Sequence, residues 1–434
     1  MLKFFKLSNS SKCTDDQLMP NETDGVVDRL RNYVNENPPL EFKGVQSKFP
    51  LILEVQSKAR FVRLSLQTLV SFHLDTIEII DKNGNNIAVG KKTIVSSTYN
   101  NEEKHDGRGA LIGRKNGGCG FHTKREHNPW LIIDLHAVYN IKKITIYNRE
   151  GKFFRRALSL SVSLSENLVE WHQIFDNWKM LNDFKKTKPT EFENAIIHAF
   201  VLDPAPSIEF LKRLKAETTH ENALKFQSCV NDVVKEKGFA FGPHGFTQTF
   251  ELRTDEEKSK VANELGKVLE WLNNEFGVAA FVSSGTLLGL VRDGKFIDHD
   301  DDVDICYISN TEGEKAILEE RESIVAFLRD KGCRLTPSGV AHYWCMTPGK
   351  QHLDIFTGFM EGDNCSMNPF SRNEVKMDAV LPLQTSIYHG ATLYLPAKPE
   401  ILLEANYGPD WKVPDPLWSF NWSKSKKDFG FLYF

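Results

Sequence analysis

Residues 284–305 read SGTLLGLVRDGKFIDHDDDVDI, and this stretch decides the fold class expected for the C-terminal half of the chain. An apolar run, VAAFVSS, precedes it and predicts a strand, while TLLGLVR predicts a short helix. Five of the seven residues from 298 to 304 are aspartates, and the apolar run ICYI follows them directly. Helical and extended runs continue to alternate downstream, which is typical of an α/β or α+β catalytic domain.

The aspartates are spaced as metal ligands would be. In an extended segment Asp300, Asp302 and Asp304 would share one face, where their like charges repel one another. A divalent cation such as Mg²⁺ or Mn²⁺ relieves that repulsion, because it binds carboxylate oxygens and bridges to phosphate. Asp354, in the run HLDIF, offers an acid from a second strand. The pattern predicts a metal-dependent phosphoryl-transfer centre, although acid-rich solvated loops without chemistry are also common.

The residues before the acids suit a phosphate group. Ser284, Gly285 and Thr286 form a small polar turn at the start of a helix, where backbone N–H groups attract anions. Arg292 follows on the same helix and could neutralise phosphate charge. We expect these four residues to bind a donor phosphate, with an ion pair between Arg292 and the acids as the alternative.

From about residue 42 to 180 the pattern changes to short alternating runs. These are RFVRLSLQ, HLDTIEII, WLIIDL, IKKITIYN and LSLSVSLS, with turn residues such as KNGN between them. They predict an antiparallel β-sandwich. Downstream, Ser207 is expected to cap a short helix, Gly238 to end a second and Thr254 to cap a third. The expected organisation is an N-terminal extension (1–41), a β-sandwich (42–180), a helical linker region (181–250) and a catalytic domain (251–434).

Bulk composition narrows the class of protein. A chain of 434 residues with 41% hydrophobic residues is long enough for two or three domains. Its net charge of −4 disfavours nucleic acid as a partner. No run is apolar enough for a transmembrane or signal segment, and the seven scattered cysteines lack a C-x-x-C pair. We expect a soluble, cytoplasmic protein, with peripheral attachment at the inner face of the membrane left open.

The stretch GTLLGLVRDGKFIDHDDDVDI resembles the signature of the LicD family, a branch of the nucleotidyltransferase-fold superfamily that includes fukutin-related ribitol-phosphate transferases. The runs LDIF and PLQTSIYHGATLYLPAKPEILLEANYGPDWKVP are similar to later parts of that signature. The resemblance implies transfer of phosphocholine or a polyol phosphate, such as ribitol or glycerol phosphate, from a CDP-activated donor. The implied acceptor is a hydroxyl of a cell-surface glycan of the lipopolysaccharide, capsule or teichoic-acid type, free or lipid-linked, and CMP is released.

The same resemblance implies roles for individual residues. Asp302 and Asp304 would bind the catalytic metal, Mg²⁺ or Mn²⁺, with Asp300 assisting. Asp354 would complete the site and orient or deprotonate the acceptor hydroxyl. His299 stands where the family usually carries an aromatic residue.

A second resemblance lies in GCGFHTKREHNPWLIIDLHAVYNIKKITIYNREGKFFRR, which is similar to the discoidin (coagulation-factor type C) fold and its fucose-binding lectin branch. In those lectins one histidine and two basic residues bind the sugar. The matching residues are His122, Arg149 and Arg156, which implies a glycan-binding site, and Gly151 stands where the lectins usually carry aspartate. A hydrogen-bonded, buried His122 without a ligand is the structural alternative.

Two other functions stay open at this point. The same acids could transfer an NMP group from an NTP and release pyrophosphate instead of CMP. The chain could also be a non-catalytic glycan-binding protein. The intact acids Asp302, Asp304 and Asp354 disfavour the non-catalytic reading, because crowded carboxylates without a task tend to be lost.

Overall fold

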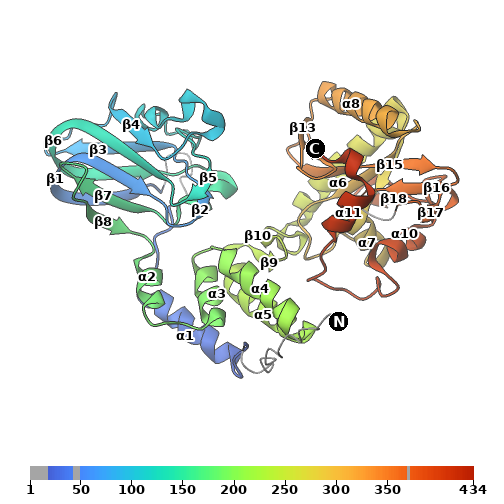
Figure 1. The fold of residues 1–434 in the computed structure, drawn as a ribbon, viewed down its shortest axis with the longest axis horizontal. Coiled ribbons are helices and arrows are strands. Elements are labelled where there is room, and N and C mark those ends of the chain that lie inside the picture. The colour runs from blue at the N-terminus through green and yellow to red at the C-terminus, as the bar shows by residue number, and fades with distance from the viewer. Residues whose placement is uncertain (1–17, 43–48, 369–371) are drawn as a thin grey trace, which may run out of the picture. The chain divides into compact units, whose positions relative to one another are not determined.

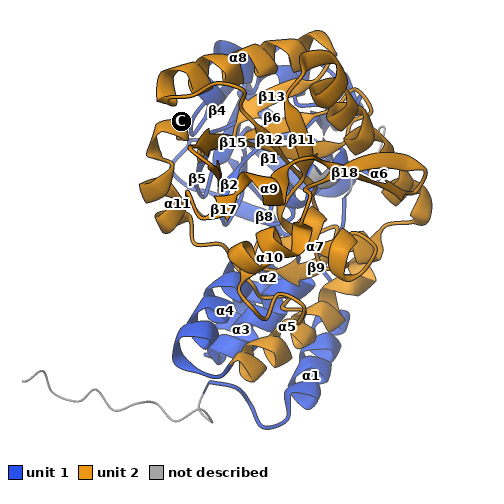
Figure 2. Ribbon diagram, turned by 90° about the vertical axis from the view of Figure 1, so that its right-hand side faces the viewer, with its two compact units in different colours: residues 1–219 blue, residues 220–434 orange. Residues whose placement is uncertain are grey.

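The computed structural model describes residues 18–42, 49–368 and 372–434, so that the N-terminal run MLKFFKLSNSSKC lies outside the described residues. The chain divides into two compact units, Met1–Thr219 and His220–Phe434, which Figure 2 colours separately. Within the described residues, no helix is both long and apolar enough to cross a bilayer.

The first unit contains a six-stranded sheet in the order β3-β6-β1-β7-β8, in which β4 also pairs with β6. All of its pairings are antiparallel, as the alternating runs predicted. Its strands are β1 (Leu51–Ser65), β3 (Thr76–Asp81), β4 (Lys92–Val95), β6 (Trp130–Tyr147), β7 (Ser161–Ser165) and β8 (His172–Asp176). A separate two-stranded sheet joins β2 (Leu69–Ser71) to β5 (Arg125–His127).

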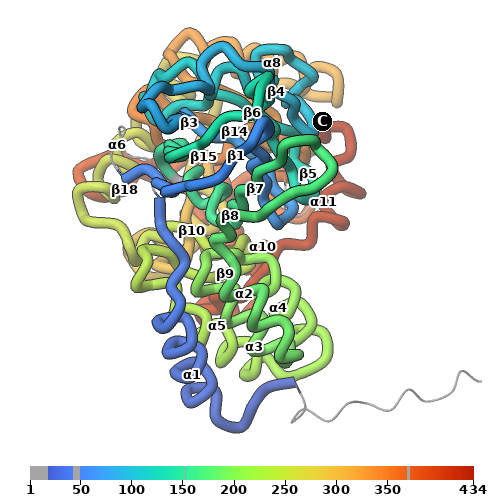
Figure 3. Tube along the Cα trace, turned by 90° about the vertical axis from the view of Figure 1, so that its left-hand side faces the viewer, coloured from blue at the N-terminus to red at the C-terminus, as the bar shows by residue number. Residues whose placement is uncertain are grey.

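The longest strand, β6, runs beside β1 along most of its length (Figure 3). The runs WLIIDL and IKKITIYN, expected as separate strands, are both part of β6. The pairing jumps from Ala59–Tyr139 to Phe61–Asp134, so residues 135–138 bulge out and the strand continues beyond them. Val62 and Ile133 are partners across the pair and both are fully buried, which places this pair in the core.

The helices of the first unit are α1 (Thr23–Glu36), α2 (Lys179–Lys185), α3 (Glu191–Phe200) and α4 (Ala205–Glu217). The expectation that Ser207 caps α4 is wrong, because the helix begins earlier, after Pro204. Ser207 is instead fully buried, and its hydroxyl donates to the carbonyl of Ala195 in α3 at 3.0 Å. A buried hydroxyl needs such a partner, so the residue joins two helices.

The second unit is built on a mixed sheet in the order β11-β12-β15-β14-β13, extended by β16 and β17. Figure 1 labels four of its strands, β13, β15, β16 and β17. Only the β12–β15 pair is parallel among its described pairings. Its strands are β11 (Ala279–Val282), β12 (Asp304–Ile308), β13 (Arg334–Pro337), β14 (Tyr343–Met346), β15 (His352–Glu361), β16 (Asn364–Met367) and β17 (Val375–Lys376). Two hairpins lie outside it: β9 (Ala240–Gly242) with β10 (Gly245–Thr247), and β18 (Gln384–Tyr388) with β19 (Ala391–Leu395).

The helices of the second unit are α5 (His220–Val234), α6 (Asp255–Glu270), α7 (Ser284–Arg292), α8 (Glu314–Asp330), α9 (Met377–Val380), α10 (Pro399–Tyr407) and α11 (Trp422–Asp428). Thr254 caps α6 as predicted: its hydroxyl accepts from the N–H of Glu257, whose carboxylate accepts from the N–H of Thr254. Gly238 ends the helical region after α5 with a left-handed φ of 78°.

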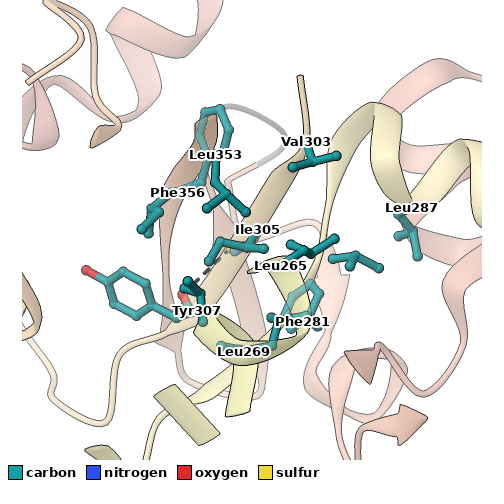
Figure 4. Packing of buried hydrophobic residues seen from close by; sticks show 14 of the residues in the cluster. Leu265, Leu269, Phe281, Leu287, Val303, Ile305, Tyr307, Leu353 and Phe356 are labelled. Atoms are coloured by element: carbon teal, nitrogen blue, oxygen red, sulfur yellow. Dashed lines mark hydrogen bonds between the residues drawn. The ribbon is translucent and has the colours of Figure 1, made fainter. Parts of the chain in front are cut away.

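Apolar side chains of α6, β11, β12 and β15 meet in the core of the second unit (Figure 4). Leu265 and Leu269 of α6 face Phe281 of β11 and Ile305 of β12, and all four are fully buried. Every residue of β12 is buried, which is typical of a central strand covered on both faces.

Candidate functional site

Two of the predicted acids lie on neighbouring strands. Asp304 begins β12 and is the register partner of Asp354 in the parallel strand β15. Asp300, Asp301 and Asp302 lie in the segment just before β12, and each has a carboxylate oxygen within 4.8 Å of the others. Of the clustered aspartates only Asp304 belongs to β12, and Asp300, Asp301 and Asp302 precede the strand in an irregular segment. The loop nevertheless brings its acids to the same end of the sheet.

Asp304 is buried, and Asp300, Asp302 and Asp354 are half-buried beside it. Burial raises the pKa of Asp300 to about 6. Burial and the carboxylates of Asp304, Asp300 and Asp354 raise the pKa of Asp302 well above its usual value, and burial with Asp354 does the same for Asp304. Across the described ranges, no lysine or arginine forms an ion pair with Asp300, Asp302 or Asp304. Hard carboxylate oxygens gathered without a counter-ion fit a divalent cation such as Mg²⁺ or Mn²⁺.

The N-terminus of α7 holds two of the acids in place. The backbone N–H groups of Gly285 and Thr286 bond to the carboxylate of Asp304 and oppose the rise of its pKa. The Thr286 hydroxyl accepts from the N–H of Asp304 at 2.8 Å. A Cβ added at Gly285 would lie 2.4 Å from Oδ2 of Asp300, so a larger residue here would displace that carboxylate. The Ser284 hydroxyl is buried without a hydrogen-bond partner, at a left-handed φ of 47°.

These contacts bear on the predicted donor phosphate site. Gly285 and Thr286 direct their N–H groups at Asp304, while Ser284 and Gly285 line the adjacent cavity. Arg292 also lines the cavity, but its guanidinium donates two bonds, of 2.9 and 2.8 Å, to the neighbouring Asp293. The donor-phosphate role of these residues stays a prediction.

The acids open into a cavity of about 630 Å³. Acids and aromatic rings dominate its lining: Asp300, Asp301, Asp302, Asp304, Asp354, Asp410, Asp415, His342, Phe356, Tyr407, Trp411, Trp418, Phe420 and Trp422. The cavity thus combines charged groups at its base with large apolar surfaces along its wall, as ligand pockets commonly do.

His342 contacts one of the predicted acids, a role that the sequence did not reveal. Its Nε2 lies 2.9 Å from Oδ2 of Asp354, and the residue is only 5% exposed. The ring packs against Phe356 at 4.5 Å and Trp422 at 5.9 Å between centroids. The Nε2 atom thus lies within ion-pair distance of the Asp354 carboxylate, although neither ring nitrogen has a partner in hydrogen-bond geometry.

A row of aromatic rings lines the cavity from Tyr407 to His342 and continues beyond its lining to Trp344, and we call it the aromatic belt. Successive ring centroids lie 4.7, 6.0, 5.1, 5.9 and 6.4 Å apart in the order Tyr407, Trp418, Phe420, Trp422, His342 and Trp344. Trp344 is 49% exposed, and its register partner in β15 is Asp354. The belt thus places an open apolar ring next to the acid on β15.

Part of the cavity comes from the region expected to be a linker. His220, Gly242, Pro243, His244 and Thr247 line it, all before residue 251. Helix α5 holds the β9–β10 hairpin, because the amide of Gln227 donates to the carbonyl of Phe241 at 2.9 Å. At the hairpin tip, Nδ1 of His244 lies 3.9 Å from Asp301, whose carboxylate raises the pKa of this histidine.

In the first unit, the structure brings the three predicted glycan-binding residues together. The rings of His122 and His73 have centroids 5.4 Å apart, and Nη1 of Arg156 lies 3.5 Å from Nε2 of His73. The guanidiniums of Arg149 and Arg156 both lie over the Phe153 ring, at 4.1 and 4.9 Å from its centroid. His122 is half-buried rather than fully buried, and its Nδ1 lies 2.7 Å from the carbonyl of Thr123. Its ligand-binding role stays a prediction.

The solved structures that are similar to this chain include two nucleotide synthases. The STING-associated CdnE c-di-GMP synthase from Capnocytophaga granulosa is 16% identical over 37% of this chain and 53% of its own, with a TM-score of 0.20. The Vibrio cholerae DncV cyclic AMP-GMP synthase is 8% identical over 45% of this chain and 51% of its own, with a TM-score of 0.17. The chain spans about half the length of these proteins, and similarity this low carries no argument. No curated protein matches the chain.

Family models match both units. Residues 93–207 match the F5/8 type C domain, and residues 277–398 match the LicD/FKTN/FKRP nucleotidyltransferase domain. The second match contains α7, the acids Asp300 to Asp304, and Asp354. The chain therefore carries an F5/8 type C domain in its N-terminal half and a LicD-family nucleotidyltransferase domain in its C-terminal half.

Proposed function

We propose that the second unit transfers a substituted phosphate from a CDP-activated donor to a hydroxyl of a cell-surface glycan, with release of CMP. The substituent is choline or a polyol such as ribitol or glycerol. The observation that carries this proposal is the pairing of Asp304 with Asp354 across two parallel strands, at the base of a cavity inside the LicD-family match. We further propose that this unit has the nucleotidyltransferase fold and that the first unit is a discoidin-type β-sandwich.

The proposed reaction moves one phosphoryl group. The acceptor oxygen forms a bond to the phosphorus that carries the alcohol, and the bond from that phosphorus to the bridging oxygen of CMP breaks. CMP leaves with the bridging oxygen, and the proton of the acceptor hydroxyl passes to the carboxylate of Asp354 and then to water. His342, whose Nε2 lies 2.9 Å from this carboxylate, is its proposed positioning residue.

The remaining acids are the proposed metal ligands. Asp300, Asp302 and Asp304 would hold Mg²⁺ or Mn²⁺, which when bound neutralises phosphate charge in such reactions. The N–H groups of Gly285 and Thr286 orient Asp304, while Ser284 and Arg292 line the side of the cavity where the donor phosphates would bind. The aromatic belt excludes water from the other side, and its exposed end at Trp344 suits the apolar face of a sugar ring.

The first unit is proposed to hold the acceptor glycan through His122, Arg149 and Arg156. Binding a glycan within the same chain raises its effective concentration at the second unit without any change in the chemistry. This division of tasks explains why one chain would contain both domains.

The test is CMP release by the purified full chain with Mg²⁺ and glycan from its host, using CDP-choline, CDP-ribitol and CDP-glycerol in parallel. One donor is expected to turn over, and Asp302→Asn is expected to abolish the activity. Asp363→Asn, at an exposed position in the same unit, is the matched control and should leave the rate unchanged. Release of pyrophosphate from an NTP would favour nucleotidyl transfer instead. Glycan binding without turnover of any donor would favour the non-catalytic alternative.

A further inference from the structure

Two arginines in the first unit share one aromatic ring. Arg149 lies between β6 and the 3-10 helix Gly151–Ala157, and Arg156 lies within that helix. Their guanidiniums lie 4.1 and 4.9 Å from the centroid of Phe153. We call Arg149 and Arg156 the arginine pair. Stacking on a common ring restricts both side chains and keeps their charges close together.

The arginine pair has no counter-ion. In the part of the chain that the structure describes, no carboxylate forms an ion pair with either guanidinium. Two acids of this region lie near Gly117 instead of pairing with either guanidinium. Asp75 accepts from the N–H of Gly117 at 2.8 Å, and a Cβ added at Gly117 would lie 2.3 Å from Cδ of Glu150.

The histidines beside the pair do not compensate its charge. His73 is fully buried, and burial together with Arg149 and Arg156 lowers its pKa to about 3. Burial also lowers the pKa of His122. Both rings are therefore neutral near pH 7. Burial, Arg149 and Arg125 together lower the pKa of Arg156, so Arg125 adds a further positive charge near the pair. No described side chain therefore neutralises the positive charge of the arginine pair.

We infer that this site binds a sugar bearing a carboxylate or a phosphate, rather than a neutral sugar. The inference rests on the proposed role of the first unit in holding a glycan, and it specifies the class of that glycan. Guanidinium groups bind carboxylate and phosphate oxygens through paired N–H donors, and an anion here would supply the missing counter-charge. The rings of His122 and Tyr99, 4.8 Å apart, offer an apolar surface beside the charges, and Tyr99 is 46% exposed.

The test measures binding to the full chain by titration calorimetry with sugars matched in their ring. D-galacturonate and D-galactose 6-phosphate are the charged probes, D-galactose and L-fucose the neutral ones, and inorganic phosphate the anion without a ring. We expect a charged sugar to bind at least about tenfold more tightly than either neutral sugar, with an advantage that falls as salt rises from about 0.05 to about 0.5 M. Equal affinity for neutral sugars, equal affinity for bare phosphate, or binding of no probe would each overturn the inference.

A pair of variants tests the missing counter-ion directly. Gly151 is exposed, an added Cβ there meets nothing within 4 Å, and its φ of 70° is one that Asp and Asn tolerate. Gly151→Asp is expected to weaken binding of the charged sugar about tenfold by supplying a carboxylate, whereas the isosteric Gly151→Asn is expected to bind nearly as well as the wild type.

Arg149→Gln and Arg156→Gln should each remove most of the charged-sugar binding, with melting temperatures confirming that the variants fold. Equal affinities for Gly151→Asp and Gly151→Asn would contradict the role assigned to charge. The measurement involves no turnover, so it is independent of the proposed transfer reaction. Tight binding of a neutral sugar would leave glycan binding intact and overturn only the inference about charge.

Discussion

At the residue scale, the buried acids make the protein's stability depend on pH and on metal. The unfolded chain releases the proton of Asp300 near pH 4, whereas the folded protein, with a pKa raised from 3.8 to about 6, retains it longer. The free energy of unfolding therefore falls as pH rises through this window, by on the order of 3 kcal/mol for this group. We expect the melting temperature of the metal-free protein to fall between about pH 4.5 and about pH 7.5.

Added Mg²⁺ should restore the melting temperature more at the higher pH, where the carboxylates are ionised. Asp302→Asn supplies the control, because it removes one carboxyl from the cluster. Without metal this variant should be more stable than the wild type at about pH 7.5 and nearly equal to it at about pH 4.5. A Mg²⁺ effect of the same size in Asp302→Asn would contradict the assignment of these acids to a metal.

His342 is predicted to act as a positioning residue for Asp354. His342→Phe keeps the ring between Phe356 and Trp422 but removes the nitrogen that lies 2.9 Å from the carboxylate. We expect kcat for CMP release to fall about 10- to 100-fold, as when orienting groups are lost elsewhere, with little change in melting temperature. His342→Gln, which retains a polar group, should recover part of the rate. A purely structural role would lower stability in both variants and leave kcat unchanged.

Individual acids could be predicted from the sequence, but their surroundings could not. The spacing of Asp302, Asp304 and Asp354 pointed to one site because acids at strand ends have few other reasons to gather. The contact between His342 and Trp422 joins residues 80 positions apart, and no local pattern encodes it. The sequence did not reveal the pairing of Arg292 with Asp293 either, because this pairing depends on side-chain conformation rather than spacing.

At the scale of elements, the N-terminal turn of α7 is predicted to support the acids rather than to act on its own. Thr286→Val would leave the buried N–H of Asp304 without its acceptor at 2.8 Å. We expect a loss of about 1–3 kcal/mol of stability in chemical denaturation, because an unpaired buried donor carries its full desolvation cost. Thr286→Ser keeps the hydroxyl and should lose much less. Equal losses in the two variants would show that packing, not the hydrogen bond, matters at this position.

The aromatic belt is predicted to contribute to acceptor binding. Trp344→Ala removes the exposed ring beside Asp354 while leaving the buried β14 contacts intact. We expect the KM for the acceptor glycan to rise about tenfold, with the KM for the CDP-activated donor unchanged, because stacking on such rings contributes about 1 kcal/mol or more. Ile387→Ala, which truncates a side chain 68% exposed on β18, is the control and should change neither KM. A rise in donor KM would place the donor, not the acceptor, on this ring.

The helices and strands could be predicted from the sequence where nearby residues alone determine their ends. Thr254 and its partner Glu257 marked the start of α6 because a capping box needs only adjacent residues. Ser207 does not cap a helix, because its hydroxyl donates to the carbonyl of Ala195 in the neighbouring helix. The two runs merged in β6 looked separate because a bulge interrupts the alternation without ending the strand. The acids of residues 300–302 form a loop because no neighbouring strand pairs with them.

At the scale of the whole molecule, the two units are predicted to cooperate through the acceptor. If the first unit binds one part of a long glycan, a second part of the same molecule reaches the second unit at raised effective concentration. Arg149→Gln should then raise the KM for a polymeric glycan by about tenfold or more, while a fragment too short to span both units shows an unchanged KM. Arg108→Gln, which removes an exposed arginine that pairs with Glu103 and Asp106 in the same unit, controls for a general loss of positive charge. An equal rise of KM for polymer and fragment would mean that the arginine acts at the second unit's own acceptor site. No change for either acceptor would mean that the first unit takes no part in substrate capture.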